Sequence, residues 1–220
     1  MGGRKLSQIT RFFDLYTQML INAVWTHVQY VVISVVIGFV IAMALAIILS
    51  RMPGISGVAL PVLGIFQTIP GLVFIGVLFI YTGIRPLTVI IALSIYAVFP
   101  ILRNTYAGIL AVPEAIKEAA RGCGMTNFQI LYKVELPMAM GAIFSGVRMA
   151  TIYTVSWAVL AAMIGLGGLG EFIYRGIETN NQMLIVGGAI PAAILAILFG
   201  FLIDFIQNKV IPRGLKGGKA

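Results

Sequence analysis

The sequence predicts an all-α integral membrane protein with five transmembrane helices, and three observations support this fold class. Of the 220 residues, 60% are hydrophobic and only 10% are charged. A soluble domain has about a quarter charged residues, because its surface faces water. The apolar residues form runs long enough to cross a lipid bilayer. The basic residues lie in short segments between those runs, as in the cytoplasmic loops of membrane proteins.

Each span is expected where about 20 residues pass without a charged side chain. Such runs lie at 28–50, 58–84, 149–170 and 184–203, and a shorter run over 86–102 extends toward residue 111. With flanking helical residues, we expect spans at about 28–50, 58–84, 86–110, 142–170 and 184–206. A loop over 111–141 then separates the third span from the fourth.

The spans form one transmembrane domain over 28–208, between an interfacial or external segment over 1–27 and a basic tail over 209–220. If the segment 103–148, which contains the loop over 111–141, is cytoplasmic together with Arg51 and the C-terminal tail, ten Lys and Arg residues lie inside and five outside. This bias predicts an external N-terminus and a cytoplasmic C-terminus. The run over 28–50 is longer than the apolar region of a signal peptide and shows no cleavage site, so we expect a retained first span.

Several function classes conflict with this pattern. The net charge of +8 lies in short segments rather than on one basic face, so no nucleic-acid partner is expected. The predicted spans carry no charged residue or histidine in their interiors, because His27 lies at the start of the first. Ion-coupled carriers usually hold such groups at membrane depth. We predict no catalytic residue, no metal ligand and no phosphate-binding Gly-Lys-Ser/Thr loop, so the chain is not expected to hydrolyse ATP.

The second span is interrupted by Gln67, Thr68, Pro70 and Gly71. Proline removes a backbone hydrogen bond, and the freed groups must be satisfied by protein or by water in a cavity. Broken helices of this kind line transport pathways. Gln67, Thr68 and Pro70 are therefore pathway candidates, and Pro191 in the last span is another. Proline and glycine are also common in membrane helices without this role, which leaves the interpretation open.

The fourth span supplies further pathway candidates. Tyr153 and Trp157 are four residues apart, hence on one helical face, and aromatic faces attract quaternary ammonium groups. Ordinary aromatic packing is the alternative that the sequence favours. Gly165, Gly167 and Gly168 end this span, where they would form an outer gate or allow close helix packing. No strand–turn–helix unit surrounds them, so their spacing does not indicate a dinucleotide site.

The loop over 111–141 predicts two short helices. The first begins with Pro113 at its first position and Glu114 in its first turn, and runs to Arg121 before Gly122 and Gly124. The second begins at a capping box made by Thr126 and Gln129, and is expected to end before Pro137.

The first of these helices combines a small surface, Ala115, Ala119 and Ala120, with like charges four residues apart. Such like-charge pairs destabilise an isolated helix by a few tenths of a kcal/mol. A small, charge-mismatched surface suits insertion into a groove of a partner. A solvated interfacial helix is the alternative.

The motif Glu118-Ala119-Ala120, followed by Gly124 and, after nine intervening residues, by Val134-Glu135-Leu136-Pro137, resembles the EAA loop of ABC importer permeases. The stretches 67–71, 96–106, 164–170 and 188–192 resemble the branch of that family for glycine betaine, carnitine and choline. The resemblance implies a type I ABC importer permease fold in which the loop docks into an ATPase. The implied coupling residues are Glu114, Lys117, Glu118, Ala119, Ala120, Arg121, Gly124, Leu136 and Pro137.

The resemblance further implies a subunit that imports a small osmoprotectant across the bacterial inner membrane and carries no cofactor itself. Its implied partners are a cytoplasmic ATPase dimer that binds ATP and Mg, a second identical or distinct permease subunit, an extracytoplasmic substrate-binding protein, and membrane lipid. Two alternatives remain: a methionine-type amino-acid importer permease, and an ATP-independent carrier or channel.

Overall fold

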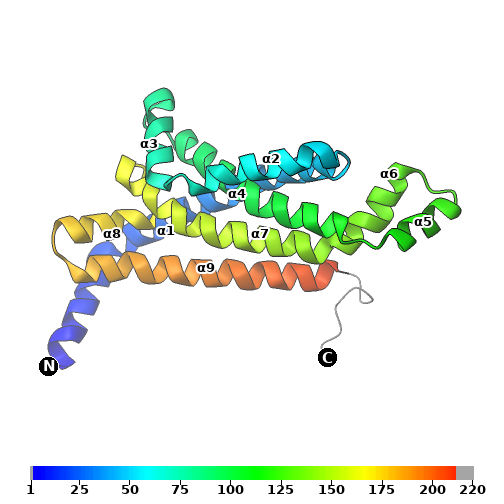
Figure 1. Ribbon diagram of the computed structural model, residues 1–220. Coiled ribbons are helices and arrows are strands. Elements are labelled where there is room, and N and C mark those ends of the chain that lie inside the picture. Colours follow the sequence, from blue (N-terminus) through cyan, green and yellow to red (C-terminus); the bar gives the residue numbers. More distant parts are fainter. Residues whose placement is uncertain (1, 212–220) are drawn as a thin grey trace.

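The computed structural model describes residues 2–211, and all regular elements in that range are helices. Four long helices lie side by side in an elongated bundle (Figure 1). They are α1 (Gly2–Ser50), α4 (Pro86–Leu110), α7 (Leu136–Ala158) and α9 (Gln182–Val210). The shorter helices are α2 (Pro53–Ile65), η1 (Phe66–Thr68), α3 (Gly71–Thr82), α5 (Glu114–Gly122), α6 (Asn127–Ile130), η2 (Leu131–Glu135), η3 (Val159–Ile164) and α8 (Leu169–Glu178).

Within residues 2–211 the structure has four helices that could span a membrane, or five if one bent pair counts as a span, against the five predicted. These four are long and apolar enough to cross a membrane, namely Phe12–Ser50, Pro86–Leu110, Asn127–Ile164 and Gln182–Val210. The bent pair Pro53–Thr68 and Gly71–Thr82 makes a fifth if it counts as one span. Large apolar side chains such as Val40, Ile80 and Phe201 are exposed on these helices. The positions of the membrane boundaries remain a prediction.

The first helix is longer than the predicted span. It begins at Gly2, so residues 2–27 continue the helix of the first span. Between residues 4 and 50 the chain contains no proline and a single glycine, Gly38, so nothing ends the helix early. At Gly38 the helix passes close to α4, where an added Cβ would lie 2.8 Å from the Cβ of Ala97. Small residues permit this approach, as is typical of packed membrane helices.

The second span is broken as predicted, and Pro70 is the residue that breaks it. The chain turns by 91° between the end of η1 and α3. Ile69 is extended, with φ −71° and ψ 125°, because a residue that precedes proline avoids the helical region. Pro70 then forms the N-cap of α3. Pro61, by contrast, is accommodated inside α2.

The core lies where α1, α4 and α7 meet. Its fully buried side chains are small or β-branched in large part: Val31, Ala42, Val89, Leu93, Ala97, Ile101, Ala150 and Ala158. Gly146 of α7 lets that helix approach α4, since an added Cβ would lie 2.9 Å from the carbonyl oxygen of Pro100. The helical loop α5–α6 projects from one end of this bundle, and α3 and α8 lie at the other (Figure 1).

Candidate functional site

Helix α5 has the predicted position with a different first residue. Pro113 is the N-cap, with an extended ψ of 134°, and the helix begins at Glu114. The predicted stop at Gly124 is confirmed, since this residue has φ +79°. Met125 donates its backbone N–H to Ala120 O at 3.1 Å, and Gly124 donates to Arg121 O at 2.9 Å. This pair of bonds is a Schellman C-cap with glycine at its left-handed position.

The capping box of the second loop helix is confirmed. The backbone N–H of Gln129 donates to Thr126 Oγ1 at 3.3 Å, and the N–H of Thr126 donates to Gln129 Oε1 at 2.8 Å. Its predicted end before Pro137 is wrong. The chain stays helical from Asn127 to Ile164, because the wide π turn of η2 replaces the α-helical turn that precedes the proline. Leu136 donates to Leu131 O, five residues back, so Pro137, which lacks an N–H, fits the start of α7.

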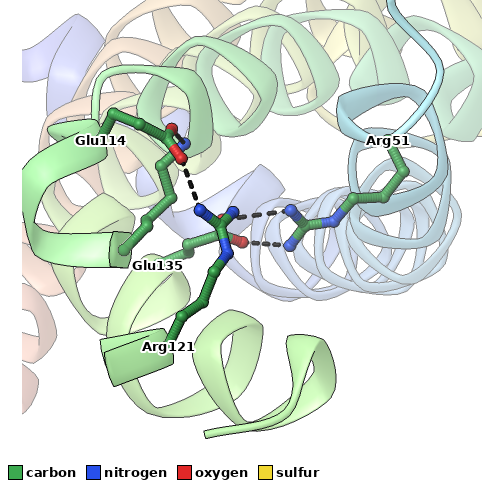
Figure 2. Close-up of polar contacts among 5 residues, drawn as sticks. Arg51, Glu114, Arg121 and Glu135 are labelled. Atoms are coloured by element: carbon green, nitrogen blue, oxygen red, sulfur yellow. Dashed lines mark hydrogen bonds and ion pairs between the residues drawn. The ribbon is translucent and has the colours of Figure 1, made fainter. Parts of the chain in front are cut away.

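The charged side chains of α5 form ion pairs, although the sequence places like charges four residues apart on this helix. The Glu114 carboxylate binds Lys117 Nζ at 2.6 Å and Arg121 Nη1 at 2.9 Å (Figure 2). The hydrogen bond from Lys117, followed by that from Arg121, lowers the pKa of Glu114 below its ordinary value of 4.5. Glu118 takes part in none of the ion pairs found among residues 2–211. It is therefore the acidic side chain of α5 left for an external partner.

The small surface predicted on α5 is divided between outside and inside. Ala115 and Ala119 are exposed, whereas Ala120 is buried. Apolar side chains that the sequence analysis did not single out lie exposed in the next helical segment: Phe128 is 75% and Tyr132 is 67% exposed. The loop thus presents small and aromatic side chains outward, and aromatic residues are enriched at protein interfaces.

A buried ion pair fastens this loop to the bundle. Glu135, in the π turn, is 1% exposed, and both of its oxygens accept hydrogen bonds from Arg51 (Figure 2). Arg51 lies in the short turn between α1 and α2, and its Nη1 is 3.1 Å from Glu135 Oε1. Sequence analysis missed the pair. The available signal was a carboxylate inside the EAA-like motif, next to apolar Leu136, which packs against a buried cluster of α4 and α7 residues.

Three of the predicted pathway residues meet at one cavity. Gln67, Tyr153 and Trp157 line it together with Tyr96 of α4, and its volume is about 250 Å³. We call it the aromatic cavity. The rings of Tyr96 and Trp157 stack with centroids 5.2 Å apart. Tyr96 lies in the family-like stretch 96–106 without any further mark as a site residue, and the four-residue spacing of Tyr153 and Trp157 does not reveal a partner on another helix.

The break in the second span holds the aromatic cavity in shape. Tyr96 Oη donates to Ile69 O at 2.6 Å, and Gln67 Nε2 donates to Tyr96 O at 3.2 Å. Gly71 allows the Trp157 ring to lie against α3, because a Cβ at this position would overlap the ring. The carbonyl of Ile69, freed at the break, is therefore satisfied by the α4 side chain of Tyr96.

The remaining pathway candidates lie elsewhere. Thr68 is exposed and donates its hydroxyl to Ile65 O. Gly165, Gly167 and Gly168 all have positive φ in the turn between η3 and α8, and Gly167 and Gly168 line a separate cavity of about 520 Å³. Pro191 lies inside α9, which continues unbroken, and it lines neither cavity.

The fold and the exposed helical loop define a multi-span membrane transport component. Residues 34–215 match the family described as binding-protein-dependent transport system inner membrane component, and the chain belongs to this family. The resemblance to ABC importer permeases is thereby confirmed.

Two curated relatives align over nearly the whole chain. The carnitine transport permease protein OpuCB of Listeria monocytogenes is 36% identical over 96% of this chain and 97% of its own. The glycine betaine/carnitine/choline transport system permease protein OpuCB of Bacillus subtilis is 36% identical over 97% of this chain and 99% of its own. Among solved structures, the inward-facing MetNI methionine ABC transporter matches with a TM-score of 0.80 and 25% identity, over 90% of this chain and 99% of that one. The predicted type I importer permease fold is confirmed.

Proposed function

We propose that this chain is the membrane-spanning permease of an ATP-driven importer for a small osmoprotectant of the glycine betaine, carnitine or choline type. The names and the nearly full-length alignment of its relatives support the substrate class. The partners in this proposal are a separate ATPase dimer that binds ATP and Mg, a second permease subunit, and an extracytoplasmic binding protein.

In this proposal the loop over 111–141, which we call the coupling loop, transmits the motion of the ATPase to the membrane-spanning helices. The exposed side of α5, with Glu118 and Ala119, docks on the ATPase, and Gly124 sets the turn into the next helix. One observation carries the argument: the chain is helical without a break from Asn127 to Ile164. The same helical rod therefore begins in the coupling loop and carries Tyr153 and Trp157 of the aromatic cavity. Helix α5 joins the start of this rod through the turn at Gly124, and from Asn127 onward a displacement reaches the cavity through continuous helix.

Reconstitution in liposomes tests this function. With the ATPase and binding protein of the same system, uptake of radiolabelled choline, carnitine or glycine betaine should require ATP. Flux through the permease alone would instead favour a carrier or channel. Methionine is the competitor to include, because the structural similarity to a methionine transporter favours an amino-acid substrate as the second candidate. Inhibition by methionine and not by choline would select that candidate.

Orientation is testable with the single cysteine of the chain. Cys123 is exposed and is the C-cap residue of α5. In this proposal the loop and the C-terminus are cytoplasmic and the N-terminus is external. A membrane-impermeant maleimide should label Cys123 in inside-out vesicles and not in intact cells. The matched control is Thr179→Cys in a Cys123→Ser background, after α8, which should label in intact cells. The reverse pattern would contradict the coupling role.

A further inference from the structure

We propose that the aromatic cavity is a transit site that binds the quaternary ammonium group of the transported solute. This inference rests on the proposed function and deepens it, because it assigns to the permease itself a recognition step after the binding protein releases its ligand. The residues that carry it are Gln67, Tyr96, Tyr153 and Trp157.

The lining has the chemistry that a quaternary ammonium ion requires. Three of the four side chains are aromatic and none is charged. A quaternary ammonium has no N–H to donate, so it needs no hydrogen-bond acceptor, and it is attracted to the negative faces of aromatic rings. A primary ammonium would bring three N–H donors into a site with few acceptors, which costs free energy. The cavity therefore favours a methylated ammonium over an ordinary amino group.

Two of the three rings, those of Tyr96 and Trp157, are fixed before any ligand enters. Tyr96 is held by its hydrogen bond to Ile69 O and by edge contact with Phe74, with centroids 5.4 Å apart. Trp157 is held between Tyr96 and the backbone at Gly71. Gln67 is anchored through its NH₂ group, which leaves its amide oxygen for a polar group of the solute. A preorganised site loses less conformational entropy on binding.

Size and strength suit a transit site. A volume of about 250 Å³ lies below the range of roughly 300–1,000 Å³ common for drug-sized ligands, as expected for a small osmolyte. Cation–π contacts without an ion pair give weak binding. A transported solute must bind well enough to enter and weakly enough to leave.

Trp157 supplies the reporter for a direct test. The chain has two tryptophans, and the other, Trp25, is 63% exposed on α1. In a Trp25→Phe background, the permease–ATPase complex in nanodiscs is titrated with choline. We expect a saturable change in permease fluorescence, measured against a complex that also carries Trp157→Phe to subtract the ATPase signal. The neutral isostere 3,3-dimethylbutan-1-ol should give no saturable change. An equal response to the isostere would overturn the cation recognition.

Variants of the lining complete the test. Tyr153→Phe keeps the ring and should bind choline within about twofold of the parent, whereas Tyr153→Leu should bind roughly tenfold more weakly. Gly71→Ala displaces Trp157 and should abolish the saturable response. Gly76→Ala, on the same helix with open space around it, should leave it unchanged.

Uptake assays separate this inference from the proposed function. If the parent complex imports choline and Tyr153→Leu and Gly71→Ala import it equally well, the transit site is wrong and the proposed function stands. If the parent complex imports no quaternary ammonium compound, the proposed function itself fails. Assembly of each variant with the ATPase is checked by size-exclusion chromatography.

Discussion

Glu135 and Arg51 are joined by two hydrogen bonds across 84 positions of the chain, and this contact ties the π turn of the coupling loop to the turn between α1 and α2. The carboxylate is buried while the guanidinium is about half exposed. Removal of the arginine therefore leaves a buried charge without its partner, which costs more than the loss of a surface ion pair.

We expect Arg51→Ala to lower the free energy of unfolding by about 2 kcal/mol, within the range for hydrogen bonds to charged groups. Glu135→Ala should cost less than this, because its exposed partner is solvated again. The double variant should lose less than the sum of the two single changes. Denaturant unfolding of the purified permease complex measures all three. Additive losses would show that the two side chains are not coupled.

Gly124 provides a prediction about backbone conformation. Its φ of +79° is unfavourable for a residue with a Cβ, so Gly124→Ala should destabilise the end of α5 by about 1–2 kcal/mol. Gly122 is the matched control. It lies inside α5 without a positive φ, and a Cβ added there would meet no atom of the surrounding structure within 4 Å. Gly122→Ala should stabilise α5 by up to about 1 kcal/mol. Hydrogen exchange of the α5 amides distinguishes the two, and equal behaviour would refute the C-cap argument.

Glu118 is expected to matter for docking and not for folding. Glu118→Arg reverses an exposed charge that has no ion-pair partner among the described residues. We expect membrane abundance to stay at the parental level and ATP-dependent uptake to fall at least tenfold. Glu178→Arg makes the same change at the exposed end of α8 and should transport normally. Normal uptake by Glu118→Arg would remove this residue from the coupling surface.

The Glu114 ion pairs predict how acid affects α5. Because Lys117 and Arg121 lower the pKa of Glu114, the stabilisation is fully present above the ordinary value of 4.5 and is lost as the pH falls through the lowered pKa. Glu114→Gln lacks this contribution at every pH. Hydrogen exchange should therefore show greater α5 protection in the parent at pH 7, with the difference vanishing at strongly acidic pH. High salt should shrink the difference, because the group is exposed. A difference that persists at all pH values would contradict the ion-pair explanation.

Local signals in the sequence were sufficient for part of the coupling loop. The start of α5, predicted one residue early at Pro113, the glycine C-cap and the Thr126 capping box each depend on residues within a few positions of one another. The broken second span also followed from a local rule, because Pro70 and the residue before it restrict the backbone. Such features are visible without knowledge of the tertiary fold.

Contacts between distant segments could not be predicted in this way. The pairing of Arg51 with Glu135, and the position of Tyr96 between Gln67 and Trp157, depend on how α1, α4 and α7 pack. The unbroken helix through Pro137 was missed for another reason. Proline usually ends a helix because of its clash with the carbonyl four residues earlier, and a π turn that avoids this clash has no reliable sequence signature.

The π turn over Leu131–Glu135 also sets the direction in which α5 and α6 point around the axis of α7. A π bulge is equivalent to one extra residue in an α-helix, and each residue turns the helix by about 100°. A one-residue deletion there would keep the rod straight yet swing α5 to another side of it. In the proposed docking arrangement, a permease without the bulge would have to meet its ATPase from a different direction.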